Sequence, residues 1–374
     1  MTRYVEQLTA RAYTVPTDAP EGDGTAAWSR TTMVLVQAHC GEAVGTGWTY
    51  GPAACATLVE ELLAPVVVGA DAMSVTGPWI AMRRAARNAT TAGAVNYAIS
   101  AVDVALWDLK ARLLDLSLVD LFGAARDSVP VYGSGGFTTY DDRQTVEQLG
   151  LWAHEQQIPR VKIKIAESHG TEEHRDLHRM QLARRTIGPR TELYVDANGG
   201  YTAKQAVRLM RAAAELDVRW LEEPVSSDDL AGLAEVRGLV DADVAAGEYG
   251  YDVTYFGRMC AAGAVDCLQV DATRAGGYTG WLRAASIAQE HGLQVSGHCA
   301  PNLHAPVAAA TENLRHLEWF HDHVRIESML FHGALDPTGG TVRPDSSHPG
   351  HGLSFNADTA QTYLRRDGYT IHAP

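Results

Sequence analysis

Short apolar runs of strand length recur between residues 129 and 318, and most of them carry a charged side chain near their C-terminal end. In chain order these side chains are Lys164, Asp196, Glu222, Glu248, Asp271, His298 and Glu318. Consecutive members are 20 to 32 residues apart, about the length of one strand, one helix and two loops. Amphipathic stretches between the runs predict helices at about 143–157, 173–186, 203–215, 228–239, 252–262, 278–290 and 303–313. The pattern predicts a (β/α)₈-type, modified TIM barrel, whose strand ends bring these side chains to one mouth.

The chain before the barrel has a different pattern. Residues 3–14 and 31–49 are β-rich and predict strands, and apolar stripes predict helices at 53–64, 78–88 and 91–114. The last of these helices places Asp103 and Asp108 toward its polar side. Residues 15–30 are dense in Gly, Pro and Asp, which favours a mobile loop. That loop is either an ordinary hairpin connection or a lid over the barrel.

These patterns predict three parts of an α/β protein. Residues 1–127 form an N-terminal α+β capping domain with the lid loop, and residues 128–340 form the barrel. The tail, 341–374, is rich in Pro, Gly and His and shows no further βα unit, so we expect it to pack back on the cap and complete it.

Composition and charge exclude several partners. The formal net charge is −14, whereas nucleic acids and anionic membranes attract clustered Lys and Arg. No run approaches the roughly 18 apolar residues that span a membrane, and the N-terminus lacks the apolar core of a secretory signal. The five cysteines are scattered and form no CxxC pair, which favours a reducing cytoplasm.

Three carboxylates end successive predicted strands: Asp196, Glu222 and Glu248. They cannot share one rim of the barrel in ionised form unless a cation joins them. Ligation by oxygen alone favours Mg²⁺ over zinc or copper, so we predict one Mg²⁺ per subunit. The alternative is that each acid caps the helix after its strand.

Lys162 and Lys164 lie two residues apart in the run VKIKI, so both side chains point to the same face of one strand. If that face is the barrel interior, each ammonium disfavours the charge of the other, and one pKa falls toward neutrality. Lys164 then serves as a general base while Lys162 stays charged and binds a carboxylate. The alternative is an edge strand with solvent-facing lysines.

Asp271 and His298 end adjacent strands and predict a second acid/base group, since a carboxylate orients an imidazole and raises its basicity. Glu318 is expected to donate a proton to an enolate oxygen if burial raises its pKa, although a structural role is nearly as plausible. Together these residues point to abstraction of a proton α to a carboxylate. A divalent metal would stabilise the enediolate that forms.

Several segments resemble the enolase superfamily, and within it the mandelate racemase/muconate lactonizing enzyme subgroup, which includes acid-sugar dehydratases. They are AISAVDVALWDLKAR, VKIKI, VDANGGYT, WLEEP, AAGE, QVDATRAGG, SGH and HLEW, and the resemblance that rests on them extends over nearly the whole chain. The resemblance implies Mg²⁺ at Asp196, Glu222 and Glu248, and a lid built from the cap loop. It further implies bases at Lys164 and at the His298–Asp271 dyad, an acid at Glu318, and homo-oligomers.

The substrate is expected to be a small-molecule carboxylate. We assign Trp28, Arg30, Tyr132 and Asn198 to its binding. Lid residues 17–25 are polar or small, which favours a polyhydroxy acid. The expected reaction is dehydration of a sugar acid to a 2-keto-3-deoxy acid. The alternatives are a racemase or epimerase of a 2-hydroxy or related carboxylic acid and, more remotely, a metal-binding barrel without catalysis.

Overall fold

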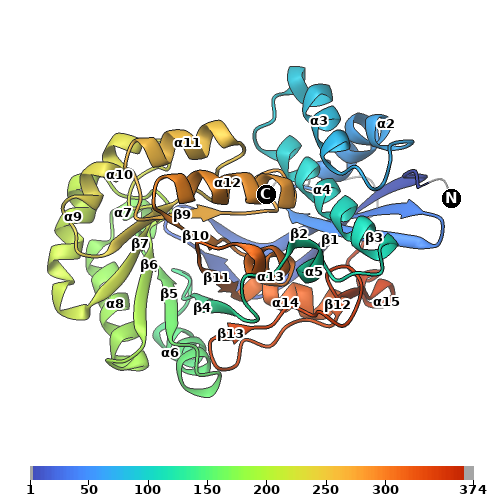
Figure 1. The fold of residues 1–374 in the computed structure, drawn as a ribbon. Helices are drawn as coiled ribbons and strands as arrows, with labels where there is room; N and C mark the ends of the chain where they lie inside the picture. The colour runs from blue at the N-terminus through green and yellow to red at the C-terminus, as the bar shows by residue number, and fades with distance from the viewer. Residues whose placement is uncertain (1–2, 366–374) are drawn as a thin grey trace, which may run out of the picture.

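A computed structural model describes residues 3–365 (Figure 1). The N-terminal part is a three-stranded antiparallel sheet in the order β1-β2-β3, covered by helices. Its strands are β1 (Gln7–Gly22), β2 (Ala27–Cys40) and β3 (Ala43–Tyr50). Its helices are α1 (Ala54–Leu58), η1 (Val59–Leu63), α2 (Ala64–Val67), α3 (Thr76–Ala85), η2 (Ala86–Ala89), α4 (Ala94–Leu113) and α5 (Leu118–Phe122).

The segment expected to be a mobile loop is instead a β-ribbon. β1 and β2 stay paired up to Gly22 and Ala27, with one irregularity between Pro16 and Glu21. Only Asp23–Ala26 forms the turn, where the Asp23 carboxylate accepts hydrogen bonds from two backbone N–H groups of the turn. The Pro and Gly residues therefore produce a bulge and a tight turn rather than an unstructured loop. We call residues 16–30 the lid ribbon.

Helix α4 joins the cap to the rest of the molecule, and its two acids are buried rather than directed to solvent. Asp103 accepts hydrogen bonds from the backbone N–H and the hydroxyl of Thr279 on the barrel. Asp108 accepts from the N–H of Thr46 in the cap and of His351 in the tail. The sequence expectation for these two residues is wrong because α4 is covered on both sides.

The second part is a closed barrel of eight parallel strands, which lie at the centre and left of Figure 1. Each strand pairs with the next, and β11 returns to β4. The strands are β4 (Val129–Gly135), β5 (Arg160–Lys164), β6 (Glu192–Asp196), β7 (Val218–Glu222), β8 (Asp243–Ala246), β9 (Cys267–Val270), β10 (Gln294–Gly297) and β11 (Leu314–Phe320). The predicted fold class is thereby confirmed.

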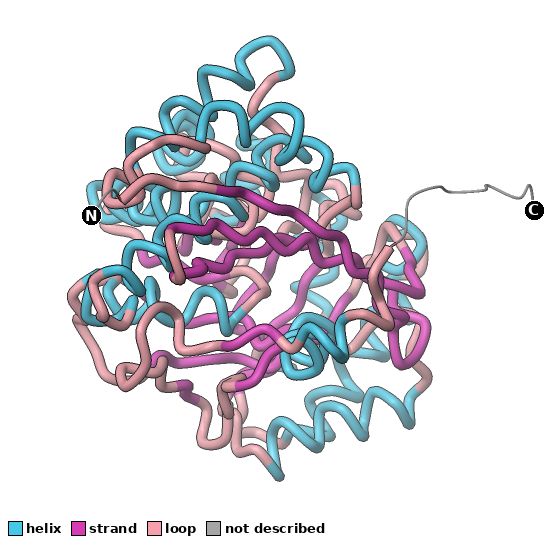
Figure 2. The backbone as a smooth tube through the Cα atoms, turned by 90° about the vertical axis from the view of Figure 1, so that its right-hand side faces the viewer, coloured by secondary structure: helices cyan, strands magenta, loops and turns pink. Residues whose placement is uncertain are grey.

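Helices alternate with the barrel strands and cover them on the outside, as the tube view also shows (Figure 2). They are α6 (Asp142–Gly150), η3 (Leu151–Glu155), α7 (Glu167–Gly170), α8 (Glu173–Ile187), α9 (Ala203–Ala212), η4 (Ala214–Leu216), α10 (Leu230–Arg237), α11 (Val253–Ala261), α12 (Gly277–Glu290) and α13 (Pro301–Ala310). The eighth unit ends in α14 (His321–Leu330), which the sequence analysis did not predict.

Strand register places the charged ends at one level. Lys164 lies opposite Asp196, and Asp196 lies opposite Glu222. Glu248 follows β8 after Gly247, whose φ is +136°. A Cβ on Gly247 would lie 2.2 Å from the backbone oxygen of Gln269, so a glycine is required where the chain turns Glu248 toward the mouth.

The tail begins on the barrel and ends on the cap. β13 (Thr341–Val342) pairs with β4, and β12 (Phe331–His332) pairs with β14 (Ser354–Phe355), which precedes α15 (Ala357–Ala360). The backbone N–H of Arg365 then donates to the oxygen of Ala12 on β1, at 2.9 Å. Residues 366–374 of the predicted tail lie outside the described residues. The proposed division at residues 127 and 340 stays a prediction. Within residues 3–365 no helix is both long and apolar enough to cross a membrane.

Candidate active site

Three acidic side chains meet at the mouth of the barrel. Asp196 and Glu222 end β6 and β7, Glu248 follows β8, and all three are at most 3% exposed. One oxygen from each lies within 4.8 Å of the others. Burial raises the pKa of Glu222 to about 7 despite the ammonium of Lys162. The crowding that sequence analysis predicted is therefore present, and it disfavours three negative charges without a cation.

The two lysines of β5 point into the barrel at different depths. Lys162 is fully buried, with its Nζ 2.5 Å from Glu222 Oε1 and 2.8 Å from Glu318 Oε1. Lys164 lies at the mouth, with its Nζ 2.5 Å from Asp196 Oδ2. Lys162 thus links two acids inside the barrel, whereas Lys164 lines the pocket above them.

The pKa values of these lysines differ from the expectation. Burial alone would lower both, but Glu222 and Glu318 outweigh it at Lys162, and Asp196 outweighs it at Lys164. Both pKa values therefore lie above the usual value for lysine. The expected fall toward neutrality is wrong for the protein groups alone, because the carboxylates beside each ammonium outweigh both its burial and the charge of the other lysine.

His298 and Asp271 form a hydrogen-bonded pair opposite the lysines. His298 Nδ1 lies 2.8 Å from Asp271 Oδ2, so Nδ1 is the donor to the carboxylate and Nε2 faces the pocket. Nε2 lies 3.2 Å from Glu248 Oε2. Burial opposes the charged imidazole, but Glu248 and the Asp271 hydrogen bond outweigh it and raise the pKa of His298. This arrangement suits a histidine that accepts and returns a proton.

Glu318 contradicts the expectation of a raised pKa. Burial favours its neutral form, yet Lys162 and His298 outweigh that effect and hold its pKa well below the usual range. Its oxygens also accept hydrogen bonds from Ser134 Oγ at 2.6 Å and the Cys299 N–H at 2.9 Å. Glu318 is therefore an ionised acceptor in this arrangement, since two hydrogen-bond donors and the charges of Lys162 and His298 stabilise the carboxylate.

Tyr132 is not at the substrate pocket. It is fully buried inside the barrel below the lysines, its hydroxyl lies 3.4 Å from Lys162 Nζ, and its ring packs on Tyr194. The assignment of Tyr132 to substrate binding is therefore wrong. The residue of β4 that reaches the site is Ser134, two positions later on the same face.

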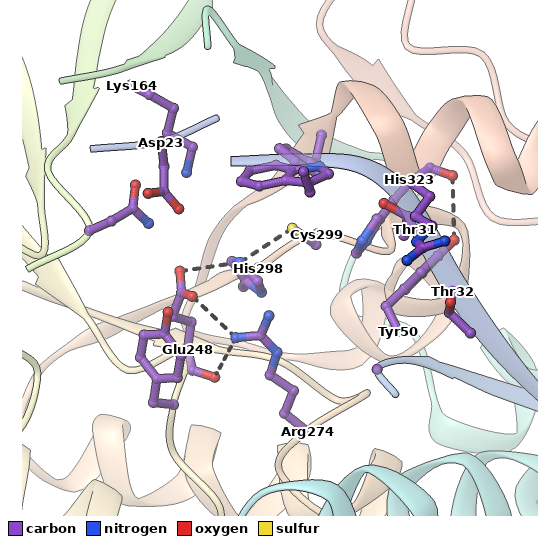
Figure 3. A pocket seen from close by; sticks show the side chains of 16 residues that line it. Asp23, Thr31, Thr32, Tyr50, Lys164, Glu248, Arg274, His298, Cys299 and His323 are labelled. Carbon is purple, nitrogen blue, oxygen red and sulfur yellow. Dashed lines mark hydrogen bonds and ion pairs between the residues drawn. The ribbon is translucent and has the colours of Figure 1, made fainter. Parts of the chain in front are cut away.

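A pocket of about 350 Å³ opens between the barrel mouth and the cap (Figure 3). The other predicted substrate residues, Trp28, Arg30 and Asn198, all line it. Lys164 and His298 lie at different sides of its inner end, as Figure 3 shows. The outer wall holds Thr31, Thr32, Tyr50, Phe320 and His323 from the cap and from the last barrel unit.

Sequence reasoning missed several pocket residues. The guanidinium of Arg274 contacts both the carboxylate set and the His298–Asp271 pair. Its Nη1 lies 3.1 Å from Glu248 Oε1, and its Nε lies 3.4 Å from Asp271 Oδ2. Arg274 lies in the segment QVDATRAGG, so its place after β9 was a usable signal. Asp23, at the turn of the lid ribbon, also lines the pocket. No sequence signal placed it there, because the turn had been interpreted as part of a loop.

The carboxylate set fits a magnesium ion. Its donors are all oxygen, they converge from three neighbouring strands, and the side-chain oxygen Oδ1 of the adjacent Asn198 is buried without a partner among the described residues. Mg²⁺ is typically held by a few carboxylates with other positions left for substrate or water. Asp196, Glu222 and Glu248 would therefore be its ligands.

Comparison with known proteins places this architecture in a family. A profile described as "Enolase C-terminal domain-like" matches residues 144–359, and one described as "Mandelate racemase / muconate lactonizing enzyme, N-terminal domain" matches residues 9–123. The chain belongs to the enolase superfamily, in its mandelate racemase/muconate lactonizing enzyme subgroup, and is an enzyme of that superfamily. The resemblance inferred from the sequence motifs is confirmed.

Two characterised relatives catalyse different reactions. The chain is 31% identical over 262 residues to L-talarate/galactarate dehydratase of Salmonella typhimurium, an alignment that covers 69% of this chain and 62% of that enzyme. It is 30% identical over 370 residues to D-galactarolactone cycloisomerase of Agrobacterium fabrum, covering 94% of this chain and 96% of the relative. The relatives therefore include both a dehydratase and an isomerase.

Solved structures agree in fold. A mandelate racemase/muconate lactonizing enzyme-like protein from Rubrobacter xylanophilus is 48% identical, with a TM-score of 0.93 over 97% of this chain and 100% of its own. A racemase from Streptomyces coelicolor with bound magnesium is 28% identical, with a TM-score of 0.90 over 96% of this chain and 99% of its own. Magnesium thus occurs in a structure that resembles this chain over almost its whole length.

Proposed function

We propose that this protein removes the proton α to the carboxylate of a sugar acid with the help of Mg²⁺, and dehydrates the acid to a 2-keto-3-deoxy acid. The observation that carries the proposal is the position of the two bases. Lys164 contacts Asp196 at one end of the carboxylate set, and His298 contacts Glu248 at the other. Both side chains line one pocket, so a substrate held there lies between two groups that transfer protons.

Each step has a residue for it. Mg²⁺, when bound to the three carboxylates, would supply a Lewis acid for the substrate carboxylate. Lys164 takes the α-proton; a metal ion held by Asp196 would weaken the attraction of this carboxylate for the Lys164 ammonium, which is what raises the lysine pKa. His298, protonated with Asp271 behind it, donates a proton to the departing β-hydroxyl. Lys162, fully buried and paired with Glu222 and Glu318, holds these two carboxylates in place below the pocket.

The pocket supports a hydroxylated substrate. Asp23, Asn198, Thr31 and Thr32 supply oxygen and nitrogen atoms around it, and Arg30 adds a cation. A polyhydroxy chain offers hydroxyl groups that can hydrogen-bond to these side chains, whereas an aliphatic chain offers none. The similarity to a sugar-acid dehydratase supports the same substrate class.

Incubation with Mg²⁺ and a panel of sugar acids in D₂O tests the proposal. We expect one or more acids to give a keto acid that has lost one water, together with deuterium at the α-carbon of recovered substrate. The Glu222→Gln variant is the matched control and should give neither signal. The absence of both signals for every carboxylate tested, with Mg²⁺ bound, would contradict the proposal.

The second candidate is an isomerase, either a racemase or epimerase or a cycloisomerase. The two bases at opposite sides of the pocket favour it, because removal of a proton on one face and return on the other inverts the carbon. Similarity to a racemase and a cycloisomerase supports it as well. The same incubation separates the two reactions, since an isomerase yields a product of unchanged mass and no keto acid. Homo-oligomerisation and a cytoplasmic location stay predictions.

A further inference from the structure

A second group of ligating side chains lies outside the active site, where the lid ribbon meets the barrel. Asp18 and Glu21 belong to the irregular stretch of β1, and His321 is the first residue of α14. One ligating atom from each of the three lies within 4.8 Å of the others. His321 Nε2 is 2.9 Å from Asp18 Oδ2. Residues 303 positions apart in sequence thus converge at this junction.

Glu21 is fully buried, and only one of its two carboxylate oxygens has a hydrogen-bond partner among the described residues. Oε2 accepts a hydrogen bond from Trp28 Nε1 at 2.9 Å. Oε1 has no hydrogen-bond partner among residues 3–365. The nearby Asp322 is also fully buried, and its Oδ2 is likewise unpartnered within the described chain. A buried carboxylate oxygen without a hydrogen-bond partner is destabilising, so the junction lacks a donor or a cation.

The nearby cation, Arg325, directs its Nη2 to other groups, while its buried Nε has no hydrogen-bond partner among the described residues. Arg325 Nη2 lies 2.5 Å from Asp322 Oδ1 and 2.8 Å from the backbone oxygen of Pro16. His321 directs its Nε2 to Asp18. Burial, with Asp322 adding to it, raises the pKa of Glu21 to about 9. The protein groups alone therefore do not balance the Glu21 carboxylate, and either a proton or a metal ion must do so.

We propose that Asp18, Glu21 and His321 bind a second divalent cation, of the zinc or manganese kind, which fastens the lid ribbon to the barrel. Two carboxylates and one imidazole suit these ions better than Mg²⁺, which prefers oxygen alone. One ligand atom from each of the three side chains converges on the same point, which favours a metal ion over a proton, since a shared proton joins only two atoms. The side chains of Asp18 and His321 are 47% and 24% exposed, so an ion can enter and water can complete its coordination.

An ion at this junction would act on the substrate pocket through Trp28. The indole N–H of Trp28 is bonded to Glu21, and the same side chain lines the pocket. The ribbon is also held by hydrogen bonds at and before its turn, such as those from Thr138 Oγ1 to the oxygen of Asp23 and from Thr139 Oγ1 to the oxygen of Pro20, both 2.6 Å. A metal clamp would therefore fix the base of the ribbon and the orientation of Trp28 together.

The first experiment counts zinc ions. Metal-free full-length protein is dialysed against Zn²⁺, and bound metal is measured in the unmodified chain, Asp18→Asn, His321→Asn and a control. The control is His332→Asn, which removes an exposed histidine of β12 that is not part of the cluster. We expect the first two variants to bind one ion fewer, or to bind it at least about 10-fold more weakly. The same difference should persist in a Glu222→Gln background, which separates this site from the carboxylate set.

The second experiment follows the lid ribbon by hydrogen exchange. Zn²⁺ should slow exchange of residues 17–28 in the unmodified chain and in His332→Asn, but not in His321→Asn or Asp18→Asn. Equal zinc binding in all four chains would overturn the proposal and leave a proton on Glu21. If the Asp18→Asn and His321→Asn variants bind one ion fewer but Zn²⁺ does not change hydrogen exchange in the lid ribbon of any chain, the ion does not fasten the ribbon to the barrel. If one variant fails to fold, the other still gives the comparison.

Discussion

Loss of either active-site base should affect only one face of the substrate. Lys164 and His298 have separate partners, Asp196 at 2.5 Å and Asp271 at 2.8 Å, so removal of one base leaves the other in place. Lys164→Ala should therefore abolish α-proton exchange with one configuration of the α-carbon and retain it with the other. His298→Asn should show the converse, and Asn keeps a hydrogen-bond donor toward Asp271.

The expected magnitude follows from the role of a positioned base. Such a base contributes roughly 10²–10⁴-fold to the rate, which corresponds to about 3–5 kcal/mol in the activation barrier. The assay measures deuterium incorporation from D₂O at the α-carbon of each epimer, with Mg²⁺ saturating. Lys204→Ala and His332→Asn, both exposed and outside the pocket, are the matched controls and should leave both exchange rates unchanged.

A different result would refute the two-base reasoning. If both variants lose both exchanges to the same extent while each still binds Mg²⁺, only one residue is a base. The other would then merely position the substrate. Measurement of Mg²⁺ affinity is necessary, because Lys164→Ala also removes the closest cation from Asp196.

Three further expectations concern neighbouring groups. Glu222→Gln should weaken Mg²⁺ binding by at least about 10–100-fold in calorimetry and abolish turnover; unchanged affinity would count against the ligand assignment. Asp271→Asn removes a group that raises the pKa of His298. In a plot of α-proton exchange rate against pH, the acidic limb due to His298 should therefore move to lower pH, and the maximum rate should fall. Arg274→Met removes the guanidinium that pairs with the Glu248 carboxylate, so the thermal midpoint of unfolding should fall. Added Mg²⁺ should reduce the difference in thermal midpoint between the variant and the unmodified chain. If Mg²⁺ leaves that difference unchanged, the lost stability comes from packing and not from charge.

The barrel was predictable because each strand ends in a residue that stands out from its apolar run. Lys164, Asp196 and Glu222 were visible in this way, and strand register then places them at one level. Glu248 and His298 followed from the same pattern. The eighth helix was missed because α14 begins with His321-Asp322-His323, which lacks a clear apolar stripe in sequence.

The lid ribbon was mispredicted for a different reason. Pro16, Pro20 and the turn residues are signals of broken strand structure, and they do coincide with the register shift between Pro16 and Glu21. Whether such a stretch is a loop or an irregular strand depends on the partner that supplies hydrogen bonds. That partner is β2, whose strand begins at Ala27, four residues earlier than the strand predicted to start at residue 31. Local sequence does not contain this information.

The charge states of the site residues depend on how deep in the barrel each side chain lies. The alternation of side chains along a strand does not predict that depth. A period of two places Lys162, Lys164 and Tyr132 on the inner face of the barrel but does not say in which layer each lies. Strand pairing does, since Tyr132 is opposite Glu318 in β11 and Ser134 is opposite Lys162 in β5. Lys162 therefore lies one layer below Asp196 and Glu222, opposite Tyr194. Its ammonium reaches Glu222 and Glu318, so its pKa is raised rather than lowered. The electrostatics of this site are thus a property of registers between strands, and a substitution that shifts one register would change them without altering any catalytic residue.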